Sequence, residues 1–433
     1  MKGIFLFGFL LLFNSALASE EQSDDIALIK TKIGQLYAQV EQLEKDKFLS
    51  NESGVVSVDL ANDDLSSLVS TQSQHVLSNA WWQNFELYGF AAVGYYQTGE
   101  DANRPDGGFE IKEATLFIES EVWEDINFFL ELQTHRYAND GKATQTGEAY
   151  LHFRNVPVGE QIIGFKAGRI DIPFGEDYLY QDSVDNPLIT HSAAWPYGWD
   201  EGILVYGNYQ GLGWIASLTD GSDIRNTDDG SEKALNLKIY GDICDTLYMS
   251  FSWMRNGDSS KSAIEFGGSH FEPVDDLSSN PVVDRSSLQV DAELFEWDGK
   301  YKIGESSLLL SYGEAKQIDK VSEFSRDLYW YSIEPNWKIN QHWYTLLRYS
   351  EIGTGDKNKG FHFEGKSFAN GNKTYGFEAK TFTRMALGLG WIPNPRIIAK
   401  FELGKDHFEL IDNASMAEMN ERDFIGLELI GKF

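Results

Sequence analysis

Apolar and polar residues alternate with a period of two from about residue 81 to the end of the chain. In residues 113–122, Ala114, Leu116 and Ile118 share one face, while Glu113 and Glu119 lie on the other. This alternation predicts β-strands with one apolar and one polar face. We count about sixteen such runs, at 85–98, 110–122, 127–137, 147–155, 161–173, 202–210, 212–220, 233–241, 245–256, 286–297, 306–316, 327–337, 341–352, 381–392, 396–408 and 423–433.

The links between these runs differ in length in a regular way. Short links alternate with longer polar ones, which lie at 99–109, 138–146, 174–201, 221–232, 257–285, 353–380 and 409–422. Transmembrane β-barrels have tight turns at one end and long loops at the other, whereas a soluble sandwich is not expected to alternate so regularly. We therefore expect an all-β fold, an antiparallel transmembrane barrel of about 16 strands over residues 81–433.

In such a barrel the apolar face of each run is expected to face lipid and the charged face the lumen. For the run at 286–297 this places Ala292 and Leu294 on the apolar side, opposite Asp291 and Glu293. Tryptophans near run ends or on apolar faces are expected to form interfacial girdles. They are Trp81, Trp82, Trp123, Trp253, Trp330, Trp343 and Trp391.

The N-terminal part has a different pattern. Lys2, an apolar run from Ile4 to Phe13 and the small-residue site ending at Ala18 predict a signal peptide over residues 1–18. Apolar spacings of three and four from Ile26 to Leu43 predict a short coiled-coil helix over 19–48, with a single amphipathic helix as the alternative. Residues 49–80 are rich in Ser, Asn and Asp and are interpreted as a polar linker.

Composition narrows the function classes. Aromatic residues make up 14% of the chain, and 40 residues are glycine. This composition is expected when alternate residues face lipid and the rest face water. The net charge of -31 disfavours nucleic acid as a partner, because a phosphate backbone is bound by Lys and Arg. The only cysteine, Cys244, excludes an internal disulfide and lacks the partners of a zinc site. We expect no cofactor.

The last strand carries a separate signal. Ile425, Leu427 and Leu429 share a face with the terminal Phe433. This resembles the C-terminal strand that the barrel-assembly machinery of bacterial outer membranes recognises, although Gly431 stands where a larger residue is commoner. The resemblance implies an outer-membrane protein of a Gram-negative bacterium, in contact with lipid and lipopolysaccharide, with its coiled coil in the periplasm.

A further resemblance concerns the third long loop, residues 174–201. The passage from Lys166 to Glu176, above all Pro173-Phe174-Gly175-Glu176, resembles the strand-to-loop segment of the family named for phosphate-selective porins O and P. Membership would imply a homotrimeric, passive diffusion channel for small hydrophilic solutes, in which basic lumen residues near the constriction bind anions. The third loop of general porins folds into the lumen.

The loop of this chain departs from that family in its charge. We expect its acidic residues to form a pore constriction that favours cations, because carboxylates repel anions. The constriction residues would be Glu176, Asp177, Asp182 and Asp185, together with His191, the only potentially cationic side chain of the loop. They would face a basic wall of Arg136, Arg154, Lys238 and Arg348. The alternative is that the carboxylates lie in a solvated external loop or hold divalent cations with lipopolysaccharide.

Aromatic residues of the same loop allow two interpretations. Tyr178, Tyr180, Trp195, Tyr197 and Trp199 either anchor the loop to the wall or stack on sugars, as in a carbohydrate-selective porin. A surface-binding barrel that does not conduct is a third possibility. Sequence motifs of catalysis are absent, so we expect no enzyme and no catalytic residue, and His152 is only a weak candidate for an outer-membrane hydrolase.

Overall fold

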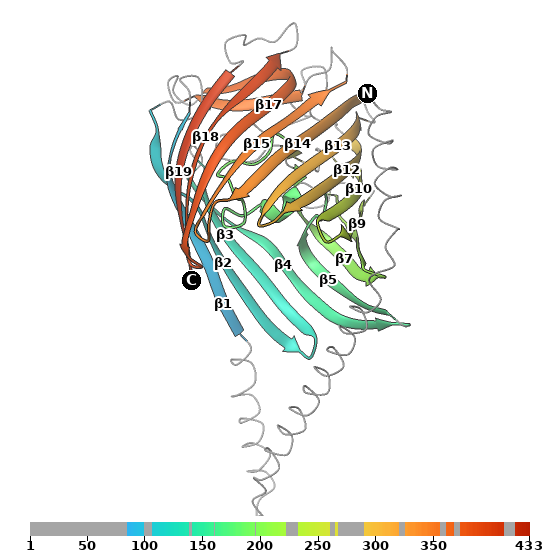
Figure 1. Ribbon diagram of the computed structural model, residues 1–433. Coiled ribbons are helices and arrows are strands. Elements are labelled where there is room, and N and C mark those ends of the chain that lie inside the picture. The colour runs from blue at the N-terminus through green and yellow to red at the C-terminus, as the bar shows by residue number, and fades with distance from the viewer. Residues whose placement is uncertain are drawn as a thin grey trace, which may run out of the picture. The chain divides into compact units, whose positions relative to one another are not determined.

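The computed structural model of the protein describes residues 85–98, 106–137, 141–159, 161–194, 196–221, 233–259, 265–266, 290–319, 325–355, 361–367, 373–410 and 421–433 (Figure 1). The expected signal peptide, coiled-coil helix and linker lie outside these residues. Among the residues described, no helix is both long and apolar enough to cross a membrane.

The described residues form a closed antiparallel β-barrel whose wall contains sixteen strands (Figure 1). Each strand pairs with its neighbours along the chain, and β1 closes the ring by pairing with both β2 and β19. The wall consists of β1 (Phe85–Thr98), β2 (Gly108–Trp123), β3 (Ile126–Tyr137), β4 (Gly141–Val158), β5 (Gln161–Asp171), β7 (Trp199–Tyr209), β8 (Leu212–Thr219), β9 (Ala234–Cys244), β10 (Leu247–Ser259), β12 (Val290–Ile303), β13 (Ser306–Asp319), β14 (Ser325–Lys338), β15 (Trp343–Thr354), β17 (Lys373–Asn394), β18 (Ile397–Leu410) and β19 (Glu421–Lys432).

Three further strands lie outside this wall. β16 (Phe361–Ser367) pairs with the loop-side part of β17, and β6 (Pro196–Tyr197) pairs with β11 (Glu265–Phe266) in a two-stranded sheet. Every one of the sixteen predicted runs overlaps one wall strand, so the predicted fold class of the barrel is confirmed.

The barrel closes where the last residue meets the first strand. The Phe433 amide donates to the Gly89 carbonyl (3.0 Å), and the Gly89 amide donates to the Phe433 carbonyl (3.2 Å). The short turns between strands use positive φ angles, as at Asp125 (63°) and Gly211 (89°). Such angles match the twist of tight hairpins, and glycine adopts them without steric cost.

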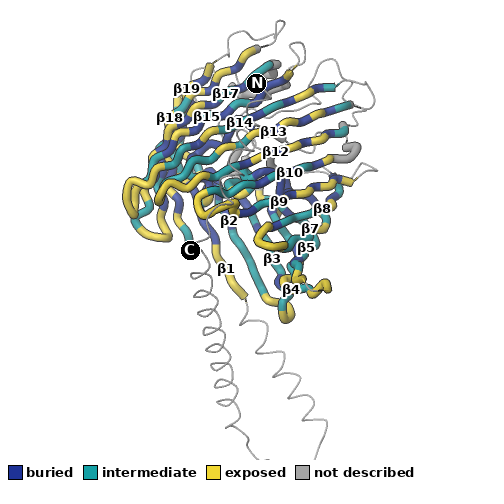
Figure 2. Tube along the Cα trace, turned by 45° about the vertical axis from the view of Figure 1, so that its right-hand side comes forward, coloured by how far each residue is buried: buried dark blue, intermediate teal, exposed yellow. Residues whose placement is uncertain are grey.

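Side chains alternate between the lumen and the outer surface, and Figure 2 shows the resulting alternation of burial along the strands. In β19, Phe424 and Glu428 are buried inside, whereas Leu427 and Leu429 are 53% and 50% exposed outside. Trp343 and Trp391 stack at the short-turn end of the outer surface, with ring centroids 5.9 Å apart. An outer surface so rich in exposed apolar side chains is expected to contact lipid or a partner.

Two expectations about orientation were wrong. Ala292 and Leu294 of β12 are buried inside the barrel, and Glu293 is exposed outside. Trp330, expected in a girdle, is 1% exposed and lies inside, with its ring 6.4 Å from that of Phe174. The physical reason is an apolar cluster in the lumen, where wall residues pack against the segment that follows β5.

Candidate functional site

The segment between β5 and β7, residues 172–198, is called L3 here and enters the ring of strands (green in Figure 1). It contains one 3-10 turn, η2 (Asp177–Tyr180). Its backbone is bonded by side chains of strands far apart in the wall. Lys112 of β2 donates to the Ile189 carbonyl (2.7 Å), and Ser350 of β15 accepts from the Ala193 amide (2.8 Å). L3 therefore lies against the lumen surface on more than one side.

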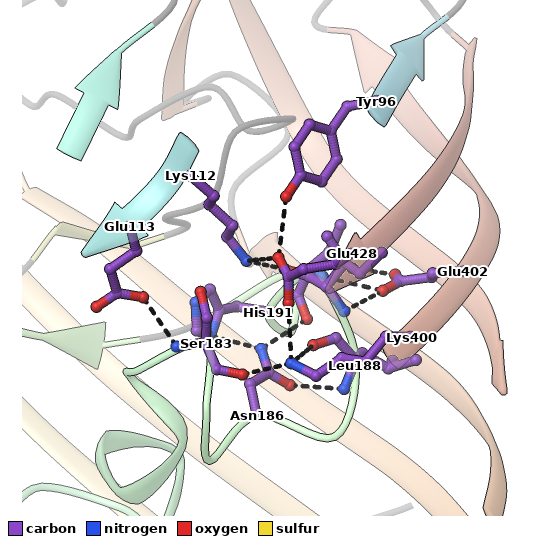
Figure 3. Close-up of polar contacts among 12 residues, drawn as sticks. Tyr96, Lys112, Glu113, Ser183, Asn186, Leu188, His191, Lys400, Glu402 and Glu428 are labelled. Carbon is purple, nitrogen blue, oxygen red and sulfur yellow. Dashed lines mark hydrogen bonds and ion pairs between the residues drawn. The ribbon is translucent and has the colours of Figure 1, made fainter. Parts of the chain in front are cut away.

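Residues 188–194 of L3, called the anchor segment, are buried throughout. Irregular backbone in such a place needs hydrogen-bond partners, because water does not supply them. The Glu402 carboxylate accepts from the amides of Ile189 and Thr190 and from the Thr190 hydroxyl (Figure 3). Arg348 donates to the Thr190 carbonyl (2.7 Å) and pairs with Glu334 (2.6 Å). Wall charges thus hold the loop backbone.

A buried ion cluster holds the same part of L3. The Glu428 carboxylate lies 3.1 Å from Lys400 and 3.3 Å from Lys112, and accepts from the Tyr96 hydroxyl (3.0 Å) (Figure 3). Lys400 also donates to the carbonyls of Ser183 and Leu188, the second at 3.2 Å. Buried charges are tolerated when they are paired and hydrogen-bonded. In this cluster the two lysines pair with Glu428, and backbone carbonyls of L3 accept their further hydrogen bonds.

A β-bulge in β2 directs two consecutive side chains to the loop. Ala92 pairs with Glu113 and Val93 with Ile111, so Lys112 is the extra residue. Lys112 and Glu113 are both buried, and Glu113 accepts from the Ser183 amide (3.0 Å). Strict alternation would send one of the two outward, and the bulge removes that restriction.

The N-terminal end of L3 is fastened on the other side of the wall. Lys238 of β9 donates to the Gly175 carbonyl and lies 2.9 Å from the Glu176 carboxylate. Tyr248 of β10 donates to the same carboxylate (2.7 Å), and the Gly175 amide donates to Ser252 (3.0 Å). L3 is thereby held at both of its ends.

Between these fastenings lie residues 176–185, all of which except Ser183 are at least partly exposed. In the predicted channel they would face the pore, and they are called the pore-facing segment. Leu179 is 49% exposed, and Asp185 is also exposed. A cavity of about 340 Å³ lies between Asp185 and the short-turn end of the wall, where Lys338 and Tyr344 line it. Open space therefore adjoins the end of this segment, at Val184 and Asp185.

Carboxylates gather beside the pore-facing segment. Glu113 and Glu131 are each 4% exposed, and Gln133 donates to Asp182 at 3.4 Å. Burial, then the charges of Glu113 and Glu131, raise the pKa of Asp182 well above its ordinary value. Burial likewise raises the pKa of Asp185. This part of the lumen is acidic.

His191 behaves differently from the sequence expectation of a cationic loop residue. It is buried in the anchor segment, and its Nδ1 lies 3.3 Å from the Asn186 amide nitrogen. Burial, then the charges of Lys112 and Arg348, hold its pKa well below the ordinary range. His191 is therefore neutral near pH 7 and does not face open space.

The other predicted basic residues are dispersed. Lys238 and Arg348 contact L3 directly, as described above. Arg154 pairs with Glu121 (3.6 Å) near the short turns. Arg136 lies in β3, and its side chain is outside the described part of the structure. The three whose side chains are described, Lys238, Arg348 and Arg154, therefore do not form one wall opposite the loop.

The predicted loop aromatics also occupy different places. The Tyr178 ring lies 4.7 Å from the Lys238 ammonium, and Tyr180 is partly exposed. Trp199 is 3% exposed within β7. Tyr197 belongs to β6 through its backbone, and Trp195 lies outside the described residues. Tyr178 and Tyr180 are the two that adjoin the pore-facing segment.

Sequence reasoning missed most of the residues that hold L3, above all Lys112, Lys400, Glu402 and Glu428. Alternation places the last three on the polar faces of predicted strands, but nothing local distinguishes them from other polar residues there. Among the described residues no group of His, Cys, Asp or Glu is arranged to hold a metal ion. His152 Nε2 lies 2.6 Å from the Tyr206 hydroxyl, so its nearest polar contact here is a tyrosine.

No protein-family model and no curated protein matches this chain. Solved structures do match it over 81% of its length. They include the outer membrane channel DcaP of Acinetobacter baumannii (12% identity, 97% of that chain, TM-score 0.53). Others are an anion-selective porin from Comamonas acidovorans (10%, 99%, 0.53) and OmpT, an outer membrane protein of Vibrio cholerae (11%, 97%, 0.52). At such low identity these likenesses show the fold.

Proposed function

We propose that the protein is a porin, a passive diffusion channel for small hydrophilic solutes and ions across the outer membrane of a Gram-negative bacterium. The observation that carries this proposal is L3, fastened inside the barrel with a partly exposed acidic segment between its fastenings. The outer surface supports it, because exposed Leu, Ile and Trp side chains suit lipid.

The channel is proposed to prefer cations. Asp185 lines the open cavity and Asp182 is partly exposed, whereas Glu176 is engaged by Lys238 and Asp177 accepts from Ser192 (2.6 Å). The basic residues near L3 mostly donate to loop carbonyls or pair with wall carboxylates. A lumen with surplus exposed carboxylate attracts cations and repels anions.

The surroundings of the barrel are also proposals. The short turns would face the periplasm together with the coiled coil of residues 19–48, which would support a homotrimer. Phe433 would be recognised by the barrel-assembly machinery, and the outer surface would contact lipid and lipopolysaccharide. Pro173 to Glu176 supports kinship with the phosphate-selective porins, but the acidic segment argues against phosphate as the solute.

Purified protein is expected to form ion-conducting channels in planar bilayers, with a reversal potential in a KCl gradient that indicates K⁺ preference. The double variant Asp182→Asn and Asp185→Asn should lose part of this preference, because each substitution removes a carboxyl group that can ionise beside the ion path. The wild-type preference should also weaken as the pH is lowered, beginning above the ordinary titration range of Asp near ~3.9, because both pKa values are raised.

The matched control is Asp423→Asn, which removes an exposed carboxylate from the outer side of β19. It should leave the reversal potential unchanged. Folded protein that never conducts would contradict the channel and favour a surface-binding barrel. Conduction with unchanged selectivity in the double variant would place Asp182 and Asp185 outside the ion path.

A further inference from the structure

A row of aromatic side chains follows the lumen face across β1 to β7 and is called the inner aromatic belt. Successive ring centroids are close: 5.2 Å for Tyr88 and Phe117, 5.9 Å for Phe117 and Phe129, and 5.1 Å for Phe129 and Tyr150. The row continues through His152 to Tyr206, whose rings lie 5.8 Å apart. Tyr240 of β9 and Tyr248 of β10, 6.5 Å apart, extend it.

Two of these rings lie flat against the wall. Tyr206 of β7 covers Gly164 of β5, and Tyr240 of β9 covers Gly213 of β8, since a Cβ at either glycine would collide with the ring. Both tyrosines are partly exposed. A flat ring over a bare backbone turns one face to the wall and the other to the lumen, so these two positions present aromatic faces to a passing solute.

The belt lies directly on the short-turn side of L3. Lys238 and Tyr240 are successive lumen-facing residues of β9, and Tyr240 is the one closer to the short turns. Lys238 holds Gly175 of L3. On β3, Phe129 is the second lumen-facing residue from Gln133 in the direction of the short turns. Gln133 contacts Asp182. Successive lumen-facing residues are about 7 Å apart along a strand. A solute that passes the pore-facing segment therefore meets the belt next.

Hydrogen-bonding groups flank the rings. The Lys166 ammonium lies 4.1 Å from the Tyr150 ring centre and 3.7 Å from the Glu148 carboxylate. Asn127 donates to Glu119 (2.8 Å) on the same lumen face. Aromatic faces beside carboxylates, an amide and an ammonium suit a solute with apolar C–H faces and a rim of hydroxyl groups.

We propose that the inner aromatic belt is a stacking subsite for sugars in the pyranose form, with Tyr206 and Tyr240 as its platforms. The inference rests on the proposed channel function and names a solute class for it. The site is on the wall, whereas the sequence directed attention to the aromatic residues of L3. Small hydrated ions have no apolar face that could stack on these rings, so sugars and ions separate the belt from the acidic segment.

The test uses purified protein in planar bilayers with maltotriose added during ion conduction. Maltotriose is expected to reduce the current in a saturable manner. Tyr206→Leu and Tyr240→Leu should each raise the half-blocking concentration by ~2- to 10-fold, the equivalent of one aromatic contact. Tyr206→Phe keeps the ring and should keep the block. Polyethylene glycol of similar mass, which has no ring face, should show no difference between wild type and variants.

The matched control is Tyr331→Leu on the outer surface of β14, which should leave the sugar block unchanged. Equal block in wild type and both lumen variants, or conduction that maltotriose does not reduce, would overturn the inference while leaving the channel intact. Absence of conduction in wild-type protein would overturn the proposed function instead. Heat-modifiable migration on a gel identifies variants that have folded, and Tyr206→Phe tests the ring if a leucine variant has not.

Discussion

Replacing Glu402 by leucine is expected to release the anchor segment of L3 and to give larger, fluctuating channel currents. The Glu402 carboxylate holds the backbone amides of Ile189 and Thr190, together with the Thr190 hydroxyl. Each buried amide left without a partner costs about 1–3 kcal/mol. Because ~1.4 kcal/mol changes an equilibrium tenfold, the docked loop should lose at least one order of magnitude in population relative to undocked forms.

Single-channel recording measures this effect directly. Glu409→Leu is a suitable control, because Glu409 lies on the same strand and its side chain is 53% exposed on the outer surface. Its channel should keep the wild-type current level and noise. A Glu402→Leu channel with the same conductance and noise as wild type would show that L3 is not held through this carboxylate.

The substitution Asp406→Asn is expected to lower the thermal stability of the barrel more than the removal of any exposed charge does. Asp406 is fully buried and receives Arg384 through Nε (2.7 Å) and Nη2 (2.9 Å), as well as Arg422. Arg384 also donates to the His191 carbonyl of L3 (3.2 Å). Removing one partner of a buried ion pair leaves an uncompensated charge, at a cost of about 3–5 kcal/mol.

The temperature at which folded protein converts to the unfolded band on a gel reports this loss. Asp423→Asn, an exposed carboxylate near the loop end of β19, should convert at the wild-type temperature. If Asp406→Asn also converts there, the three buried charges do not stabilise the closed wall.

The barrel was predictable because its physical cause is local. A strand with one inward and one outward face alternates every second residue, and β19 shows this from Ile425 to Leu429. The prediction of orientation was wrong at Ala292, Leu294 and Trp330, where the lumen is not aqueous. These residues face Phe174 and other apolar residues of L3, a contact that depends on a loop more than a hundred residues away in the chain.

The candidate site was partly accessible from the sequence. The acidic character of the pore-facing segment can be read directly at Asp182 and Asp185. The role of Lys112 could not be predicted, because a bulge opposite Ala92 and Val93 determines its direction. The interpretation of His191 as a potential cation failed because the sequence does not show that this side chain is buried in the anchor segment. The inner aromatic belt was missed because its rings are single residues on separate strands, and only strand pairing brings them together.

The claim that the pore-facing segment of L3 lines the conducting path has a direct test. In a Cys244→Ser background, which removes the only cysteine, Leu179→Cys is treated with a cationic thiol reagent during conduction. The control is Ile203→Cys, equally 49% exposed but on the outer face of β7. The current is expected to fall when Cys at position 179 reacts and to stay constant for position 203. Complete modification at position 179 without any change in current would contradict a pore lined by L3.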